Sequence, residues 1–384
     1  MNSICIKRKV KWKKKHYKTL NRTQVSNTFL NFFDYGQVIN MNKSIYESIK
    51  EAAVDGKLPD DYSLPDLTDG EGDVSFADGA LDGITMYHMP PFEMTESDYQ
   101  VMTEAINAAS NHEFEIADSL FIQLSKKNRA ISVSGKLQDY IIDNHDNLKA
   151  GNLYEYAVGL IQLSDNKECV KYGLLILGLL VVNNEEVKDV IRTLALSDEF
   201  TLFCVHIMYQ WSGGNNDIFE TARKVHGWGR IHALELLRPL MPRTKEIREW
   251  MLKEGINNKI APFYSALTCW RNANIGSILY VNPTYEDLHY IGKILDAMLD
   301  ESAVPGISTL DKRTDILLTY LEKAQKHALC AEDYQVIYHI CQYGETVNAA
   351  EVSQFAKDML HSDRAKSVLP DVTRRLEARK FKKP

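Results

Sequence analysis

The chain has 384 residues, of which 45% are hydrophobic and 25% are charged, as in an ordinary globular protein. The net charge of −7 hides a split, because residues 1–40 contain nine Lys or Arg and one acid, while residues 41–384 contain 36 basic and 51 acidic residues. An acidic body excludes the broad positive surface that nucleic-acid binding requires. The longest apolar run, Gly173 to Val182, is shorter than the roughly 20 residues of a membrane span.

The cysteines indicate a reducing environment. Six are present, without a CxxC pair or a cysteine-dense segment, at positions 5, 169, 204, 269, 330 and 341. Several fall within apolar helical patterns, which predicts buried, reduced thiols and a cytoplasmic location. The basic N-terminus is followed by Asn, Thr and Gln rather than by an apolar segment, so we predict no signal peptide.

The first 94 residues differ from the rest. We predict a basic disordered tail over residues 1–40; a nucleic-acid or membrane arm and an alternative start of translation at Met41 are the other interpretations. Residues 41–94 are predicted to hold one short helix, with Ile45 and Ile49 on one face, and an acidic lead-in rich in Pro and Gly. No helical period survives between residues 55 and 93, which predicts extended, partly ordered backbone there.

Residues 95–384 show the pattern of a helical-repeat domain. Apolar residues recur at helical spacing, as in Val187, Val190, Ile191 and Leu194. Predicted helices begin roughly every 14–17 residues, or about 30 residues per pair, within the range of HEAT, armadillo and TPR-like arrays. The last of them is predicted near residues 363–379. No run alternates as a half-buried strand does. The predicted fold is therefore all-α, a HEAT- or armadillo-like α-solenoid of degenerate helical-hairpin repeats.

Three consecutive helices are predicted between Gly227 and Trp270, near residues 229–240, 244–254 and 260–271. Apolar positions repeat at helical spacing in each of them. Pro239 and Pro242 are expected to end the first helix, because proline lacks the N–H donor and clashes with the preceding turn.

The densest group of polar and aromatic side chains lies at the start of this segment. It comprises His226, Trp228, Arg230, His232 and Glu235, around a glycine joint between two helices. His232 and Glu235 have the i, i+3 spacing of neighbours on a helix. One interpretation is a ligand or peptide contact on the inner face of the array. The other is a buried network that keeps adjacent repeats in register.

Motifs for cofactors and metals are weak. The run from Gly227 to His232 begins like a dinucleotide-binding fingerprint, but His232 replaces the third glycine and no strand precedes it. Four residues of types that suit zinc could face each other across a helical hairpin, or could simply pack there: His327, Cys330, His339 and Cys341. Their spacing is loose, so we assign no metal ligand, no catalytic residue and no cofactor from the residues themselves.

Three segments resemble bacterial proteins that carry the name limonene hydroxylase. They are GWGRIHALELL at 227–237, EIREWMLKEGINNKIAPFY at 246–264, and the predicted helix from Tyr285 to Leu299; the resemblance extends over about residues 41–384. It implies a monooxygenase that converts limonene to perillyl alcohol and carveol and can oxidise carveol to carvone, with NAD(P)H as the reductant. The resemblance identifies no active-site residues in this chain.

Two functions of different classes therefore follow. The resemblance implies a monoterpene hydroxylase with a small apolar substrate. The alternative is a non-catalytic HEAT-like scaffold that binds a protein partner in the groove of the solenoid. Oxygen activation requires a redox cofactor that the protein must hold, and no recognisable motif for one is present in the sequence.

Overall fold

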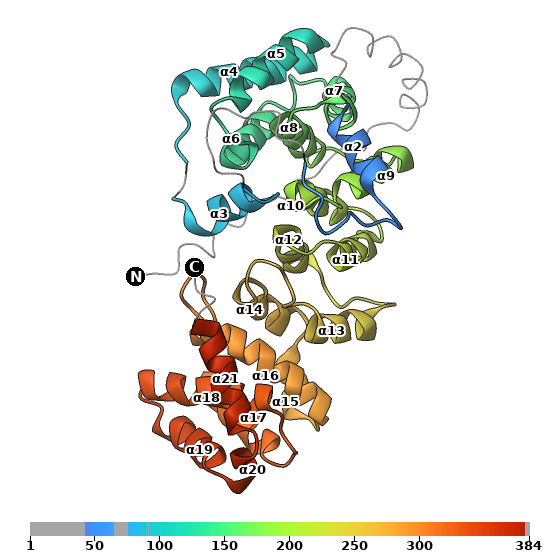
Figure 1. The fold of residues 1–384 in the computed structure, drawn as a ribbon. Coiled ribbons are helices and arrows are strands. Elements are labelled where there is room, and N and C mark those ends of the chain that lie inside the picture. Colours follow the sequence, from blue (N-terminus) through green and yellow to red (C-terminus); the bar gives the residue numbers. More distant parts are fainter. Residues whose placement is uncertain (1–42, 65–75, 91, 381–384) are drawn as a thin grey trace. The chain divides into compact units, whose positions relative to one another are not determined.

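The computed structural model describes residues 43–64, 76–90 and 92–380 (Figure 1). Within these ranges every regular element is a helix and no β-strand occurs; an isolated bridge joins Val54 and Lys57. The all-α prediction is thus confirmed. No described helix combines the length and apolarity needed to cross a bilayer. The predicted basic tail, residues 1–40, lies outside the described residues.

The chain divides into two compact units, Met1–Trp211 and Ser212–Pro384. The described helices of the first unit are α2 (Ile45–Ala52), α3 (Ala80–His88), α4 (Glu96–Ser110), α5 (Phe114–Ser125), α6 (Ala130–Asp143), α7 (Ala150–Leu163), α8 (Lys167–Leu177), α9 (Glu185–Leu194) and α10 (Asp198–Met208). Those of the second are α11 (Gly214–Lys224), α12 (Trp228–Leu236), α13 (Thr244–Lys253), α14 (Phe263–Asn272), α15 (Ile275–Tyr280), α16 (Tyr285–Leu299), the 3₁₀ turn η2 (Ile307–Thr309), α17 (Arg313–Ala324), α18 (Ala331–Thr346), α19 (Ala350–Leu360), α20 (Asp363–Lys366) and α21 (Leu369–Lys380).

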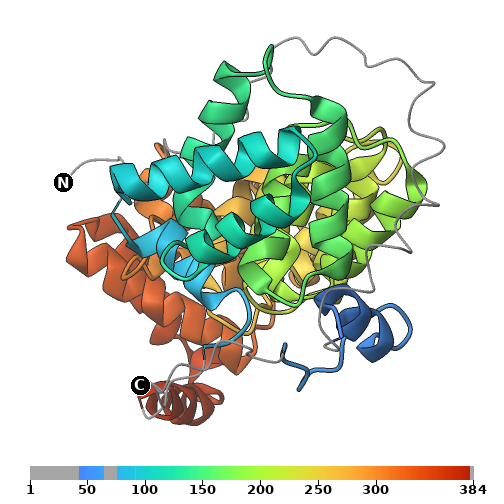
Figure 2. The same cartoon turned by 90° about the horizontal axis from the view of Figure 1, so that it is seen from above.

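In the first unit, helices pack against the next helix and against helices two or three further along the chain. α4 packs on α5, α6 and α7, and α8 packs on α6, α7 and α10 (Figures 1 and 2). The predicted apolar stripe of α9, made of Val187, Val190, Ile191 and Leu194, is buried throughout. The Asn184 side chain begins this helix by accepting the N–H groups of Glu186 and Val187. Local pattern and tertiary packing agree in this part of the chain.

The second unit repeats this packing. α12, α14, α16 and α18 form a series in which each helix packs on the next member, while α19 packs on both α17 and α18. Two His–Asp pairs join α16 to α18, His289 to Asp333 and Asp296 to His339. Residue numbers rise along both helices from one pair to the other, so α16 and α18 run parallel.

The acidic lead-in contains a helix that the sequence pattern did not predict. α3 occupies Ala80–His88 and begins after Gly79, whose φ of 75° is readily adopted only by glycine. The Gly79 N–H donates to the Glu199 carboxylate, at 2.6 Å. Extended structure was expected here because the apolar pattern of this segment is weak. The segment is ordered instead by polar contacts with residues far away in the sequence but in the same unit, such as Glu199 of α10.

Two predicted helices end or break earlier than expected, both near prolines. The predicted helix 229–240 ends at Leu236, because Pro239 disfavours helical backbone in the preceding residue, and Leu240 is exposed. The predicted helix 363–379 is divided into α20 and α21. Pro370 has no N–H to donate to the carbonyl four residues earlier, which favours a break there.

Candidate functional site

The sequence-predicted cluster at the start of α12 is centred on a buried arginine. The Arg230 side chain donates from Nε to the Val225 carbonyl, at 2.9 Å, and from Nη1 to the Asn257 carbonyl, at 2.6 Å. Its Nη2 lies 3.3 Å from Nδ1 of His226, and its guanidinium lies over the Trp250 ring. Arg230 therefore joins three segments that are separate in the sequence.

The remaining members of that cluster lie against neighbouring helices. Trp228 stacks on His232, with 6.1 Å between ring centroids, and contacts Tyr264 of α14 at 4.9 Å. Trp228 and His232 are buried, whereas Glu235 is half-buried. The Glu235 carbonyl accepts from Arg238 at 2.8 Å. Trp228, Arg230 and His232 thus belong to the packed interior of the second unit, which supports the network interpretation.

The glycine joint does not fit the pyrophosphate of NAD(P)H. A phosphate at a helix N-terminus must reach free backbone N–H groups. At the start of α12, Trp228 and Arg230 are only 4% and 6% exposed, and the His226 carbonyl accepts the Lys259 N–H at 2.7 Å. The guanidinium that would neutralise a phosphate already binds carbonyls. The first turn of α12 is therefore covered by protein.

A second cluster lies in the first unit around Lys171, a residue of α8 that is fully buried. Its ammonium lies 2.5 Å from the Glu199 carboxylate, 2.7 Å from Asp82 and 3.0 Å from Glu168. Glu168 also accepts the Ala130 N–H, at 2.6 Å. If all four groups were ionised, the cluster would carry two uncompensated negative charges. These groups come from α3, α8 and α10.

The pKa values of Asp82 and Glu199 are shifted in opposite directions by their surroundings. Burial, together with the charges of Glu168 and Glu199, raises the pKa of Asp82 to about 6 despite the attraction of Lys171. The Asp82 carboxylate forms an ion pair with the Lys171 ammonium at 2.7 Å. For Glu199, burial is outweighed by Lys171 and the Gly79 N–H, and its pKa is lowered.

The same carboxylates keep Lys171 charged. Burial opposes its positive charge, but Asp82, Glu168 and Glu199 together raise the pKa of the Lys171 ammonium well above its ordinary value. A lysine acts as a nucleophile only as the neutral amine, which this environment disfavours. The cluster is therefore suited to holding α3 against α8 and α10 rather than to covalent catalysis.

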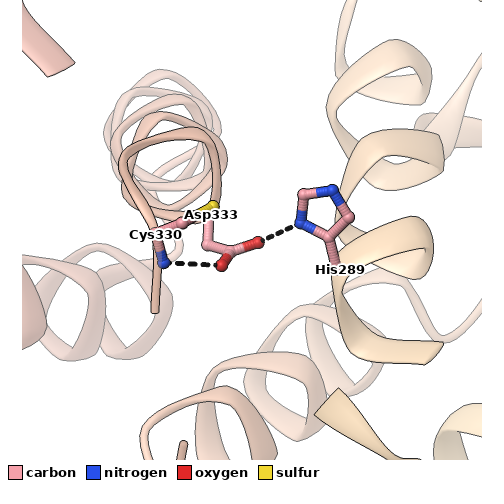
Figure 3. Close-up of side chains that lie close together, drawn as sticks. All are labelled: His289, Cys330 and Asp333. Atoms are coloured by element: carbon pink, nitrogen blue, oxygen red, sulfur yellow. Dashed lines mark hydrogen bonds and ion pairs between the residues drawn. The ribbon is translucent and has the colours of Figure 1, made fainter. Parts of the chain in front are cut away.

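A third cluster lies between α16 and α18 in the second unit. Figure 3 shows His289 of α16 facing Asp333 and Cys330 at the start of α18. His289 Nδ1 lies 2.7 Å from an Asp333 oxygen, and the three potential ligand atoms all lie within 4.8 Å of one another. His289 is partly exposed, Cys330 is exposed and Asp333 is buried. The donor set combines nitrogen, sulfur and oxygen, and solvent can reach its His289 and Cys330 members.

Local helix capping positions the two α18 members of this cluster. The Cys330 N–H donates to Asp333 Oδ2 at 2.9 Å, and the Cys330 sulfur accepts the Asp333 N–H, in the manner of a capping box. The Tyr285 hydroxyl donates to the same Asp333 oxygen at 2.8 Å. Burial raises the pKa of Asp333, but the hydrogen bonds from Cys330, His289 and Tyr285 outweigh burial and leave this pKa lowered.

The four residues that could have formed a zinc site across a helical hairpin lie at separate places in the structure. They are His327, Cys330, His339 and Cys341. Cys330 faces His289, while His339 pairs with Asp296. The Cys341 sulfur lies 3.7 Å from the Ser353 carbonyl. The His327 ring is 6.1 Å from that of Tyr285, beside the Cys330 cluster. No spacing rule could have indicated His289 and Asp333 as partners, because 44 residues separate them.

A shallow depression lies beside the start of α18. Its volume is about 390 Å³ and it is lined by Ala331, Asp371, Arg374 and Arg375. Arg375 is also 3.9 Å from Glu332, the residue after Ala331. Charged side chains of this kind suit a polar ligand, not a hydrocarbon.

No known protein family, curated protein or solved structure matches this chain. Its function therefore has to be inferred from its own residues, and three clusters are the candidates. The Arg230 network and the Lys171 cluster are closed by protein. The cluster of His289, Cys330 and Asp333 is open to solvent.

Proposed function

We propose that the helices of this chain form a HEAT-like α-solenoid. Packing between alternate helices supports this, since stacked hairpins place equivalent helices side by side. The parallel direction of α16 and α18, which follows from their two His–Asp pairs, is what stacking of successive hairpins requires. Short helices with degenerate apolar stripes are typical of such arrays.

The function that this geometry supports best is that of a scaffold for a protein partner. The observation that carries it is the role of the buried polar residues: Lys171 and Arg230 both bind groups from other helices and loops, so they stabilise the array itself. The excess of acidic residues over 41–384 favours a basic partner, because opposite charges steer association.

Affinity capture at low and high salt tests the scaffold proposal. The purified chain should retain one basic protein in stoichiometric amount at low ionic strength and release it as salt rises. A partner that remains bound at high salt would contradict the electrostatic part of the proposal. Absence of any stoichiometric partner from the cell of origin would contradict the scaffold function.

The second candidate function is limonene hydroxylation, and the resemblance of residues 227–237, 246–264 and 285–299 supports it. The activity would convert limonene to perillyl alcohol and carveol, and carveol to carvone, with NAD(P)H as reductant. The glycine joint that begins like a dinucleotide-binding fingerprint is covered by protein, so NAD(P)H would have to bind elsewhere or to a separate reductase. We assign no residue to its steps.

A single assay separates the two functions. The purified protein is supplied with limonene, NADPH and oxygen, with and without a cell extract as a source of reductase, and products are analysed by gas chromatography. Turnover by the pure protein would support the hydroxylase. Turnover only with extract would support one component of a multi-protein oxygenase. No product above a protein-free control under either condition would contradict the hydroxylase and leave the scaffold.

A further inference from the structure

The open cluster between α16 and α18 contains the donor types that zinc prefers. Zinc is bound in proteins by imidazole nitrogen, thiolate sulfur and carboxylate oxygen, and His289, Cys330 and Asp333 supply one of each within 4.8 Å. A thiolate and a carboxylate together also neutralise the two charges of the ion. Sulfur and imidazole are poor ligands for magnesium and calcium, which prefer oxygen.

We propose that His289 Nδ1, Cys330 Sγ and Asp333 Oδ1 bind a zinc ion, and that water completes the coordination. The 2.7 Å contact between His289 and Asp333 is a hydrogen bond in the metal-free chain. Zinc–ligand bonds of about 2.0–2.3 Å in a tetrahedron place ligand atoms roughly 3.3–3.7 Å apart. Binding releases the Cys330 thiol proton to solvent and shifts the His289 proton from Nδ1 to Nε2, where it faces Glu332. It moves the His289 and Asp333 side chains apart by less than about 1 Å.

The surroundings of the cluster are those of a supported metal site. In metal-binding histidines the N–H of the second ring nitrogen commonly donates a hydrogen bond to a carboxylate, which fixes the orientation of the ring. His289 Nε2 lies 3.5 Å from the Glu332 carboxylate, on the opposite side of the ring from Nδ1. Tyr285 and the Cys330 N–H hold Asp333 Oδ2, leaving Oδ1 directed at His289. Each protein ligand is thus oriented before the ion arrives.

The site has an entry path and an open coordination position. Cys330 is exposed, so an ion can reach the sulfur without unfolding the helix pair. Three protein ligands leave room for one further ligand, as in zinc sites that bind water or substrate. Lys293 and Arg375 lie 3.7 and 3.9 Å from Glu332, so they offset the extra negative charge of that residue.

The second His–Asp pair provides a matched control. His339 and Asp296 join the same two helices, with the residue types exchanged between them. No Cys lies within ligand distance of that pair in the described part of the chain, since the metal-type cluster there comprises only His289, Cys330 and Asp333. A change at His339 therefore removes a comparable interhelical contact without removing a proposed ligand.

The test measures zinc binding to the full chain after removal of metals by chelator. Competition with a chromophoric chelator should give about one zinc ion per wild-type chain, with affinity lowered at least tenfold in Cys330→Ser and in His289→Gln. Glu332→Gln should keep the stoichiometry and lose about tenfold in affinity, as expected of an outer carboxylate. His339→Gln should bind zinc as the wild type does.

Cobalt gives an independent readout of the sulfur ligand. Cobalt(II) bound through Cys330 should show thiolate-to-metal charge-transfer absorption, which Cys330→Ser abolishes. Circular dichroism and melting of each metal-free variant check that the fold is retained. Failure of the wild type to bind zinc, unchanged affinity in Cys330→Ser, absence of the charge-transfer band, or an equal loss in His339→Gln would each overturn the proposal.

Discussion

The Lys171 cluster of the first unit and the Cys330 cluster of the second both bring ionisable side chains from different helices together, but in opposite environments. Lys171 is 0% exposed and its three carboxylates are largely enclosed, so their charges are stabilised by protein groups rather than by water. Cys330 is exposed, and the polar groups near it can exchange a protein partner for an ion or water. Burial therefore makes the first cluster a structural element, and access leaves the second available for ligand binding.

The largest expected effect comes from removing the buried ammonium. Lys171→Met should lower the free energy of unfolding by about 3–5 kcal/mol, because it leaves buried carboxylates without a counter-ion. Urea unfolding measures this loss. Lys43→Met, which removes the exposed pair with Glu51, should change stability by less than about 1 kcal/mol. Equal effects of the two variants would contradict the distinction by burial.

The pH dependence of stability should reveal Asp82. Its folded pKa of about 6 exceeds its ordinary value of 3.8, so the folded chain binds a proton more tightly than the unfolded chain. Stability should consequently fall as pH rises from about 4 to about 6, by about 2–3 kcal/mol, and level off above. Urea unfolding across this range should show the slope in the wild type and not in Asp82→Asn.

A matched variant controls for the other carboxylates. Asp363→Asn changes an exposed acid that pairs with Lys366 and should leave the pH profile of the wild type intact. Parallel profiles for wild type and Asp82→Asn would show that Asp82 does not titrate in this window.

Arg230 is an intermediate case, a buried cation balanced by carbonyl dipoles. Arg230→Met should cost about 2–3 kcal/mol, because the Val225 and Asn257 carbonyls lose a charged donor. Arg230→Lys should recover only part of the stability lost in Arg230→Met, since an ammonium cannot reproduce the planar, forked hydrogen-bonding geometry of the guanidinium. Thermal melting checks this order. Unchanged melting in Arg230→Met would show that this network does not stabilise the unit.

The smallest effect is expected at the two His–Asp pairs without metal. His289→Gln and His339→Gln should each cost about 1 kcal/mol, since both pairs are partly exposed. They lie about two helical turns apart on α16, or roughly 10 Å, so the double variant should be additive. Zinc should then raise the melting temperature of His339→Gln and not of His289→Gln. Equal responses to zinc would contradict the contrast between the clusters.

Residues that act within one helix could be predicted from the sequence. The α9 stripe from Val187 to Leu194 is buried as its 3.6-residue period predicted. The helix predicted from Tyr285 to Leu299 is present as α16, which begins after a capping box of Thr284 and Asp287. The Arg230 group was also recognisable, because polar residues interrupt an apolar pattern. A buried network was one of the two interpretations of this group, but its partners could not be predicted, because the Asn257 carbonyl that Arg230 binds lies in a later loop.

Helical period, caps and prolines act over a few residues, so the sequence alone determined that this protein is all-α and where most helices begin. Which helices meet depends on packing between degenerate stripes that could fit several neighbours. Only the tertiary structure could therefore join Asp82 to Lys171 and Glu199, or His289 to Asp333. It also decided that Lys171 is enclosed and Cys330 is open, because exposure is a property of the packed array and not of the local sequence.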